Sequence, residues 1–162
     1  MKKLNRKGYM TVEIIIASVI AFSIAFFLME ITIKLVDISD NEYVNTNFMT
    51  DKALIMKNIK ENIRNDIGDY GKVKTISCNN NNICSIKFSD DVTRELIVDN
   101  ANFEVKYKEN SGSVLYSKKI SDGLSNISLS GGKYNNYVYF QIKGDNIFSD
   151  EIYDINIVVY NG

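Results

Sequence analysis

The sequence predicts an α+β protein in which a long N-terminal α-helix, membrane-spanning in its first half, packs on a C-terminal antiparallel β-sheet domain. The first observation is that the 59 residues from Tyr9 to Ile67 contain neither glycine nor proline, the two residue types that most disfavour a helix interior. The second is that from Val73 onward apolar and polar residues alternate, as they do in half-buried strands. We therefore expect residues 9–67 to form one helix of roughly 90 Å and residues 73–162 to form a β-rich globular domain.

The first part of the predicted helix is apolar enough to cross a membrane. Residues 9–29 are 21 residues with a single charged side chain, Glu13, and about 20 apolar residues suffice to span a bilayer as a helix. Before them stands a short leader, residues 1–8, whose basic residues are Lys2, Lys3, Arg6 and Lys7. Because Lys and Arg favour the cytoplasmic side, we expect a single-pass protein of the plasma membrane with its C-terminal domain outside the cytoplasm.

The second part of the predicted helix carries one apolar stripe. Four isoleucines recur at i, i+4 spacing: Ile55, Ile59, Ile63 and Ile67. This spacing places them on one helix face, which we expect to pack on the chain's own sheet, and the glycines at positions 68 and 71 are expected to end the helix. The asparagines at positions 41, 45 and 47 lower the helix propensity, so the sequence fits either a continuous helix or a bend near residues 39–47.

Eight short strands are predicted in the β domain, at residues 73–76, 86–88, 93–98, 103–107, 114–116, 127–129, 137–142 and 155–160. The breaks between them are rich in Asn, Asp, Ser and Gly, the residues of tight turns, and are predicted at residues 79–82, 89–91, 99–100, 110–112, 131–132 and 144–146. Short strands joined by such turns predict an antiparallel sheet, or a pair of sheets, resting on the helix.

Two cysteines, Cys78 and Cys84, flank an asparagine-rich segment that a hairpin would close. In a domain outside the cytoplasm, such a pair is expected to form a disulfide. Two reduced thiols remain the alternative. A structural zinc site needs about four ligands, and the chain has no histidine to supplement its two cysteines. We therefore predict no metal site and no cofactor.

The composition also argues against an enzyme and against a nucleic-acid-binding protein. The absence of histidine removes the commonest general base. Without the four leader cations, the chain has 15 Lys and Arg against 20 Asp and Glu, so it is acidic. Its cations are too sparse in the sequence to predict the basic patch that nucleic-acid binding requires. Acid pairs occur at residues 90–91 and 150–151, where solvated turn charges are the expected explanation.

Calcium is a weaker alternative for the acids near the C-terminus, because this ion takes oxygen ligands. The candidate ligands would be Asp145, Asp150, Glu151 and Asp154. Their spacing matches no calcium-binding loop that we recognise, so we do not predict a site there.

The N-terminal pattern resembles that of the type IV pilin and pseudopilin family over about residues 6–30. That family has a basic leader ending in glycine, an aromatic first residue of the mature chain, a glutamate four positions later and a hydrophobic helix. Here Gly8, Tyr9 and Glu13 take those places. The resemblance implies cleavage by a prepilin peptidase between Gly8 and Tyr9, and N-methylation of Tyr9. It also implies that Glu13 pairs with the terminal amine of an adjacent subunit during assembly.

The resemblance further implies a function: a structural subunit of a type IV pilus or of a type II secretion or competence pseudopilus. The expected partners are the prepilin peptidase, other pilin or pseudopilin subunits and the inner-membrane assembly platform. The subunit would pass from the membrane into a filament at the cell surface. The sequence departs from the commonest pattern in having no proline, and it does not choose between pilus, competence and secretion systems.

Three alternatives remain open. A basic start followed by apolar residues also describes a secretory signal peptide, for which Ser23, Ile24 and Ala25 would offer a cleavage site. A membrane-anchored binding or adhesion domain would keep its leader and would not need Glu13. An extracytoplasmic enzyme would need a substrate-sized, acid-lined pocket in the β domain.

Overall fold

The computed structural model describes residues 6–110, 112–120, 123–147, 150 and 152–162. The chain divides into two compact units, Met1–Asp40 and Asn41–Gly162. The elements are the helix α1 (Arg6–Tyr70) and the strands β1 (Val73–Cys78), β2 (Ile83–Phe88), β3 (Thr93–Asp99), β4 (Glu104–Glu109), β5 (Val114–Lys119), β6 (Leu124–Tyr134), β7 (Tyr137–Asn146) and β8 (Ile152–Tyr160). The predicted α+β class, with one long helix followed by antiparallel strands, is confirmed.

The helix is longer than predicted at both ends, because it begins at Arg6 and not at Tyr9. It extends past Ile67 to Tyr70 and passes through Gly68. A Cβ added at Gly68 would meet no other atom within 4 Å, so packing does not require glycine there. The helix ends at Gly71, whose φ is 81° and whose amide donates to the carbonyl oxygen of Ile67 at 3.1 Å. This left-handed C-cap favours glycine. Residues 39–47 are helical throughout, so the continuous helix, and not a break at the asparagines, is the outcome.

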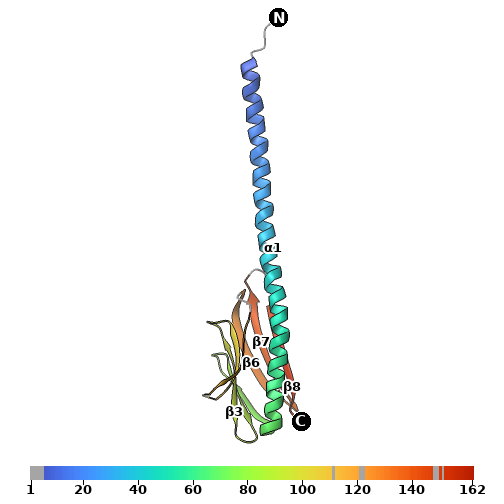
Figure 1. The fold of residues 1–162 in the computed structure, drawn as a ribbon, viewed down its shortest axis with the longest axis vertical. Helices are drawn as coiled ribbons and strands as arrows, with labels where there is room; N and C mark the ends of the chain where they lie inside the picture. The colour runs from blue at the N-terminus through green and yellow to red at the C-terminus, as the bar shows by residue number, and fades with distance from the viewer. Residues whose placement is uncertain (1–5, 111, 121–122, 148–149, 151) are drawn as a thin grey trace. The chain divides into compact units, whose positions relative to one another are not determined.

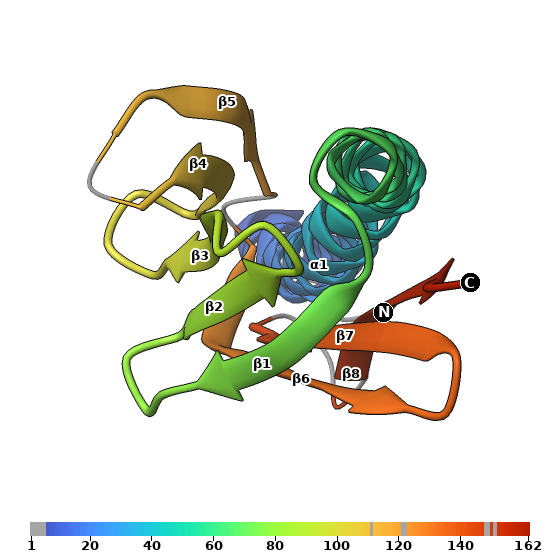
Figure 2. The same ribbon diagram turned by 90° about the horizontal axis from the view of Figure 1, so that it is seen from below.

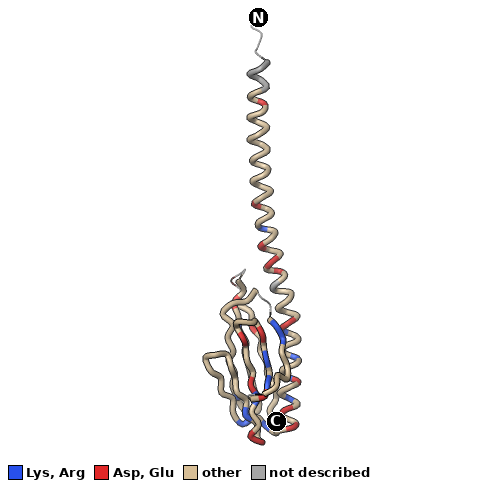
Figure 3. The backbone as a smooth tube through the Cα atoms, turned by 60° about the vertical axis from the view of Figure 1, so that its left-hand side comes forward, with Lys and Arg blue, Asp and Glu red and all other residues tan. Residues whose placement is uncertain are grey.

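The part of α1 in the first unit is exposed along its whole described length from Thr11 to Asp40, apart from a half-buried Ser18. Its apolar side chains include the isoleucines, valines and phenylalanines between residues 12 and 38, all of which are solvent-accessible. Figure 3 shows how few charged residues interrupt this part of the helix. Soluble proteins rarely expose an apolar surface of this size to water, and a helix that is apolar on all sides is typical of a membrane span.

The part of α1 in the second unit packs on the sheets, as the isoleucine stripe predicts. Ile55, Ile59 and Ile63 are fully buried, and Ile67 is partly buried against the same core. Phe48 extends the stripe toward the N-terminus and stacks on Tyr153 of β8, with ring centroids 4.3 Å apart. Figure 1 shows the strands lying along the C-terminal half of the helix.

The eight predicted strands are all present, and they form two antiparallel sheets. The first has the order β1-β2-β3-β4-β5 and the second the order β6-β7-β8. Both are meanders in which each strand pairs with the next along the chain. Figure 2 shows the two sheets facing α1, with β1 beside β6 where the sheets meet. The two outer strands, β5 and β8, are the edges that no further strand covers in the described part of the chain.

Two adjacent residues of α1 connect the helix to these two edges. Asp51 pairs with Lys118 of β5 at 3.0 Å, while Lys52 pairs with Asp154 of β8 at 3.7 Å. Because neighbouring helix positions point about 100° apart, one helix turn can contact both sheets.

Two predicted turns lie inside strands instead. Gly131 and Gly132 pair with Phe140 and Tyr139 within the β6–β7 ladder, and a Cβ added at either glycine would fall within 3 Å of those aromatic side chains. These glycines make room for rings on the neighbouring strand and do not reverse the chain. The reversal occurs at Asn135 and Asn136, where Asn135 has a φ of 51°, as two-residue hairpins require.

The other misplaced turn, residues 144–146, is the end of β7. Gly144 pairs with Tyr153 of β8, and Asp145 pairs with Ser125 of β6. Asn146 is buried and its amide donates to the side-chain oxygen of Asn41 at 2.7 Å and to the Tyr153 hydroxyl at 3.0 Å. Pairing on both sides of β7 therefore overrides the local turn preference of these residues.

Candidate functional site

The residues predicted for leader cleavage fall partly outside the described structure. Lys2 and Lys3 lie outside the described residues. Arg6, Lys7, Gly8 and Tyr9 belong to the first turn of α1 by their backbone. The cleavage and methylation assignments therefore stay predictions.

Glu13 lies on the exposed surface of α1, close to the start of its apolar segment. Within the described residues, α1 is the one helix long and apolar enough to cross a membrane. This agrees with the predicted capacity for single-pass anchoring. No further charged residue follows Glu13 until Glu30, which pairs with Lys34 at 3.2 Å.

The hydroxyl groups of the apolar segment are satisfied within the helix itself. Ser18 donates to the carbonyl oxygen of Ile15 at 2.8 Å, and Ser23 donates to that of Val19 at 2.9 Å. Thr32 donates to the carbonyl oxygen of Leu28 at 2.8 Å. A polar group in hydrocarbon is costly unless it finds such a partner, so these three hydroxyl groups are compatible with a lipid environment.

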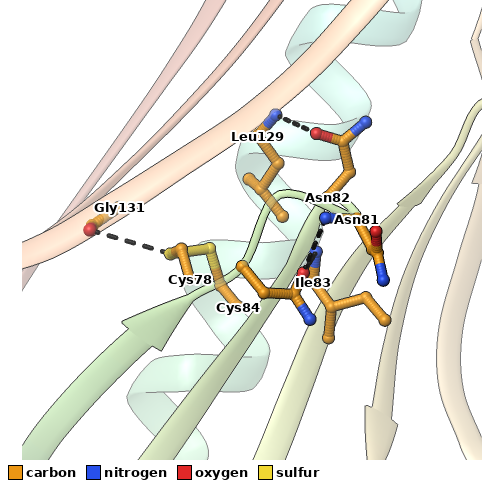
Figure 4. Close-up of a disulfide and its surroundings, with 8 residues drawn as sticks. Cys78, Asn81, Asn82, Ile83, Cys84, Leu129 and Gly131 are labelled. Atoms are coloured by element: carbon orange, nitrogen blue, oxygen red, sulfur yellow. Dashed lines mark hydrogen bonds between the residues drawn. A yellow bond between two sulfur atoms is a disulfide. The ribbon is translucent and has the colours of Figure 1, made fainter.

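Cys78 and Cys84 form the predicted disulfide, which joins directly opposed residues of β1 and β2 with a Cα–Cα distance of 4.0 Å. The segment between them is held as an Asx turn: the Asn79 carboxamide oxygen accepts from the amides of Asn81 and Ile83 at 3.0 and 3.1 Å. The Sγ of Cys78 lies 3.7 Å from the Gly131 carbonyl oxygen, a contact without a hydrogen bond because a disulfide sulfur carries no proton. Figure 4 shows how this hairpin faces β6.

Asn82, at the end of the same turn, connects the first sheet to the second. Its φ is 60°, and its side chain donates to the Ile127 carbonyl at 2.8 Å and accepts from the Leu129 amide at 3.0 Å. The Asn82 side chain thus makes the hydrogen bonds to β6 that the backbone of a neighbouring strand would otherwise make (Figure 4).

The side chain of Asn161 makes the same kind of contact with β1. It accepts from the Val73 amide at 2.6 Å and donates to the Val73 carbonyl at 3.1 Å. Neither contact was anticipated from the sequence.

A buried polar cluster surrounds Arg94 of β3. Its guanidinium donates from Nε and Nη2 to the two carboxylate oxygens of Asp66 on α1, at 3.2 and 3.4 Å, and from Nη1 to Glu109 at 3.2 Å. The Tyr107 hydroxyl donates to Asp66 at 2.6 Å. Tyr70 lies beside the guanidinium, with 5.1 Å from its ring centroid to Cζ. The cluster fastens the end of α1 to the middle of the first sheet.

The electrostatics of this cluster favour structure over acid–base chemistry. Burial raises the pKa of Tyr107, and the hydrogen bond to Asp66 and its charge raise it further. Burial lowers the pKa of Arg94, but its hydrogen bonds with Asp66 and the Asp66 charge outweigh burial, so the net shift is upward. Both groups therefore keep their protons throughout the ordinary pH range. A proton that does not leave cannot serve general acid–base catalysis near neutral pH.

Two of the calcium candidates, Asp145 and Asp154, have other polar partners. Asp145 accepts from Asn126 at 2.9 Å, while Asp154 contacts Lys52 and accepts from Asn156 at 2.7 Å. Glu151 lies outside the described residues. Among the described residues, no group of three or more His, Cys, Asp or Glu is placed to hold a metal ion.

The turn acids at positions 90–91 are likewise surface charges. Asp91 contacts Lys87 at 3.1 Å and Lys74 at 3.4 Å. The hydrogen bond from Lys87, followed by the charge of Lys74, lowers the pKa of Asp91. These contacts with two lysines are those of a solvated turn charge.

One surface of the second sheet stands out because it exposes aromatic rings. Cross-strand pairs put Tyr134 opposite Tyr137, Tyr137 opposite Tyr160 and Tyr139 opposite Val158. These five side chains, here called the tyrosine face, are all exposed, with exposed fractions between 45% and 71%. The alternation of the strands hides Val138, Phe140, Ile157 and Val159 on the opposite side, in the core. The sequence contains the alternation, but the meeting of the tyrosines depends on strand register.

Comparison with known proteins adds no relative to these observations. No family model, no curated protein and no solved structure matches this chain. The functional assignment therefore rests on the chain's own residues.

Proposed function

We propose that this protein is a structural subunit of a type IV pilus or of a related pseudopilus, processed by a prepilin peptidase and assembled through the apolar part of α1. The observation that carries the proposal is the division of this helix. From Thr11 to Asp40 its apolar side chains are exposed, and further along Ile55, Ile59 and Ile63 are buried under two sheets. Such a helix offers one apolar surface to lipid or to neighbouring helices, and a second to its own domain.

The order of residues at the N-terminus supports the same proposal. A basic leader ends at Gly8, an aromatic residue follows, and Glu13 stands four positions further on. A carboxylate inside a membrane-length apolar segment is costly and calls for a partner. The terminal amine of a neighbouring subunit, freed by cleavage after Gly8, would supply a positive charge. The attraction between the two charges strengthens as both lose water.

The first test is the intact mass and N-terminal sequence of the protein extracted from membranes of its native cells. The proposal expects a chain that begins at Tyr9 and carries one added methyl group. A chain that keeps Met1 would favour a membrane-anchored binding or adhesion domain, and a chain that begins near residue 26 would favour an ordinary secreted protein. Both of those results would overturn the pilin-like assignment.

The second test is the variant Glu13→Ala, with Glu30→Ala as the matched control. Both changes remove one exposed carboxylate from the first unit's part of α1, but Glu30 has an intrahelical partner in Lys34 at 3.2 Å. We expect Glu13→Ala to be processed normally and to be lost from filaments, measured by immunoblotting of sheared surface fractions, while Glu30→Ala assembles. Equal filament content in the two variants would contradict the role of Glu13.

A further inference from the structure

We propose that the tyrosine face of the β6–β8 sheet binds an uncharged glycan by stacking sugar rings on Tyr137, Tyr139 and Tyr160. This inference goes beyond filament assembly and does not depend on it. Exposed aromatic residues that gather on one surface mark interaction sites. The four tyrosines come from three different strands, so the sheet register, and not local sequence, creates the surface.

The strands hold the rings close together. Strands are about 4.8 Å apart, and successive residues on one side of a strand are about 6.8 Å apart, so neighbouring members of the tyrosine face start within about 7 Å of one another. Tyr137 and Tyr160 are directly paired, with ring centroids 5.6 Å apart in an edge-to-face arrangement. An exposed pair held by the backbone of two strands loses little freedom when a ligand binds.

Gly132 supplies a second, independent indication. It pairs with Tyr139 across β6 and β7, and a Cβ at this position would lie 2.7 Å from the Tyr139 hydroxyl oxygen and 3.0 Å from Cζ. The Tyr139 ring therefore lies over the backbone of Gly132, a place that a side chain would occupy in any other residue. A ring laid against the sheet turns a face toward solvent, which is the geometry that stacking requires.

The next row of the same surface is polar and uncharged. Gln141 of β7 pairs with Ser130 of β6 and with Asn156 of β8. A sugar ring has an apolar face of C–H groups and an edge of hydroxyl groups. Tyrosine rings beside hydroxyl and amide side chains present the complementary chemistry, because hydroxyl and amide groups both donate and accept hydrogen bonds.

The charges around the tyrosine face favour a neutral ligand. The following row places Lys143 directly opposite Asp154, and Asp154 also contacts Lys52 of α1 at 3.7 Å, so charges of both signs lie beside the tyrosine face. Lys133 on β6 directs its ammonium group to the Val73 carbonyl at 2.8 Å and not to this surface. A polyanion such as single-stranded nucleic acid needs a positively charged groove along the rings, which this surface does not provide.

A second copy of the chain is a less suitable occupant. The centre of a stable interface between copies is usually more apolar than the rest of the surface. Val158 is the one aliphatic member of the tyrosine face, and every aromatic member carries a hydroxyl group. Tyrosine also occurs at interfaces between proteins, so the sedimentation measurement below separates a second copy of the chain from a glycan.

The test measures retention of the full chain on three insoluble, uncharged glycans: chitin, cellulose and insoluble β-1,3-glucan. The protein is solubilised in a detergent without a sugar head group, so that the detergent does not compete. We expect retention on at least one glycan, and we expect Tyr137→Ala and Tyr139→Ala each to weaken it roughly five- to tenfold, the range of an aromatic contact. Gly132→Val, which displaces the Tyr139 ring, is expected to weaken it similarly.

The matched control is Tyr43→Ala, which removes an exposed tyrosine of α1 that is not part of the tyrosine face. This variant should keep wild-type retention, and far-ultraviolet circular dichroism during heating should show that every variant melts like the wild type. Failure of the wild type to bind all three glycans would overturn the proposal, as would equal retention by the sheet variants and by Tyr43→Ala. A change in sedimentation of Tyr137→Ala without glycan retention would assign the surface to contacts between copies, and retention on single-stranded DNA instead of glycan would assign it to nucleic acid.

Discussion

The two parts of α1 use isoleucine in opposite ways. Between residues 11 and 40, isoleucines occur on all sides of the helix and are exposed, whereas Ile55, Ile59 and Ile63 repeat on one side and are fully buried. Helix propensity does not separate the two parts, because both consist of ordinary helix-compatible residues without proline. The difference teaches that the distribution of apolar residues around a helix, more than their number, indicates what surrounds it.

Ion pairs repeat the same contrast. The first part carries Glu30 and Lys34, whose side chains are 64% and 69% exposed, and the second carries Asp66, which pairs with Arg94 where both side chains are at most 10% exposed. An exposed pair at i, i+4 spacing stabilises a helix by about 0.3–0.5 kcal/mol. Removing one partner of a buried pair, in contrast, leaves a charge without compensation.

The largest expected effect tests this contrast directly. Asp66→Ala should lower the free energy of unfolding by about 3–5 kcal/mol, because Arg94 would stay buried without its main partner. Glu30→Ala, the control, should change it by no more than about 0.5 kcal/mol. Guanidinium denaturation followed by near-ultraviolet circular dichroism of the tyrosines measures both, since the chain has no tryptophan. Equal losses in the two variants would remove the distinction between the two ion pairs.

The next effect compares one isoleucine from each part. Ile59→Ala should destabilise the Asn41–Gly162 unit by about 2–5 kcal/mol, because it opens a cavity in a close-packed core. Ile33 is 53% exposed, so Ile33→Ala should leave the unfolding of that unit unchanged. The same denaturation curves provide the measurement. If Ile33→Ala were as destabilising as Ile59→Ala, the residues around Ile33 would have to form part of the same packed core.

The smallest effect concerns the β domain alone and sharpens the comparison. Replacing both cysteines (Cys78→Ser with Cys84→Ser) should reduce the free energy of unfolding by about 2 kcal/mol, as expected for a short closed loop. Amide exchange at Leu129 should become faster, because Asn82 is held by the same hairpin. The helicity of residues 11–40 should not change. A reducing agent should affect the wild type and not the double variant; a shift in both would show that the reagent acts elsewhere.

The elements of the fold could be predicted because each leaves a periodic signal. The isoleucine stripe indicated the packed part of α1, the alternation from Val73 indicated the strands, and the spacing of Cys78 and Cys84 indicated the disulfide. These signals extend over few residues, and local rules suffice to interpret them. The candidate N-terminal site comes from its pattern of residues, since the structure tests neither cleavage nor assembly.

The contacts between elements could not be predicted, because they depend on register and on the approach of distant segments. Gly131 and Gly132 match a turn by local rules, yet aromatic rings on β7 explain their presence. Asp66 pairs with Arg94, 28 positions away. To predict this ion pair, one would need to know both which side of α1 faces the sheet and the order of the strands. Asn82 lies in a predicted turn and Asn161 follows the last predicted strand, yet their side-chain amides join the two sheets.

Asp51 and Lys52 carry a consequence for how α1 finds its position. The carboxylate meets Lys118 of β5 and the neighbouring ammonium group meets Asp154 of β8. If the helix slipped by one residue in one direction, Lys52 would face Lys118, and in the other direction Asp51 would face Asp154. Each shift brings like charges together. The two adjacent residues therefore disfavour both misalignments of the helix on the sheets, although each ion pair by itself is weak.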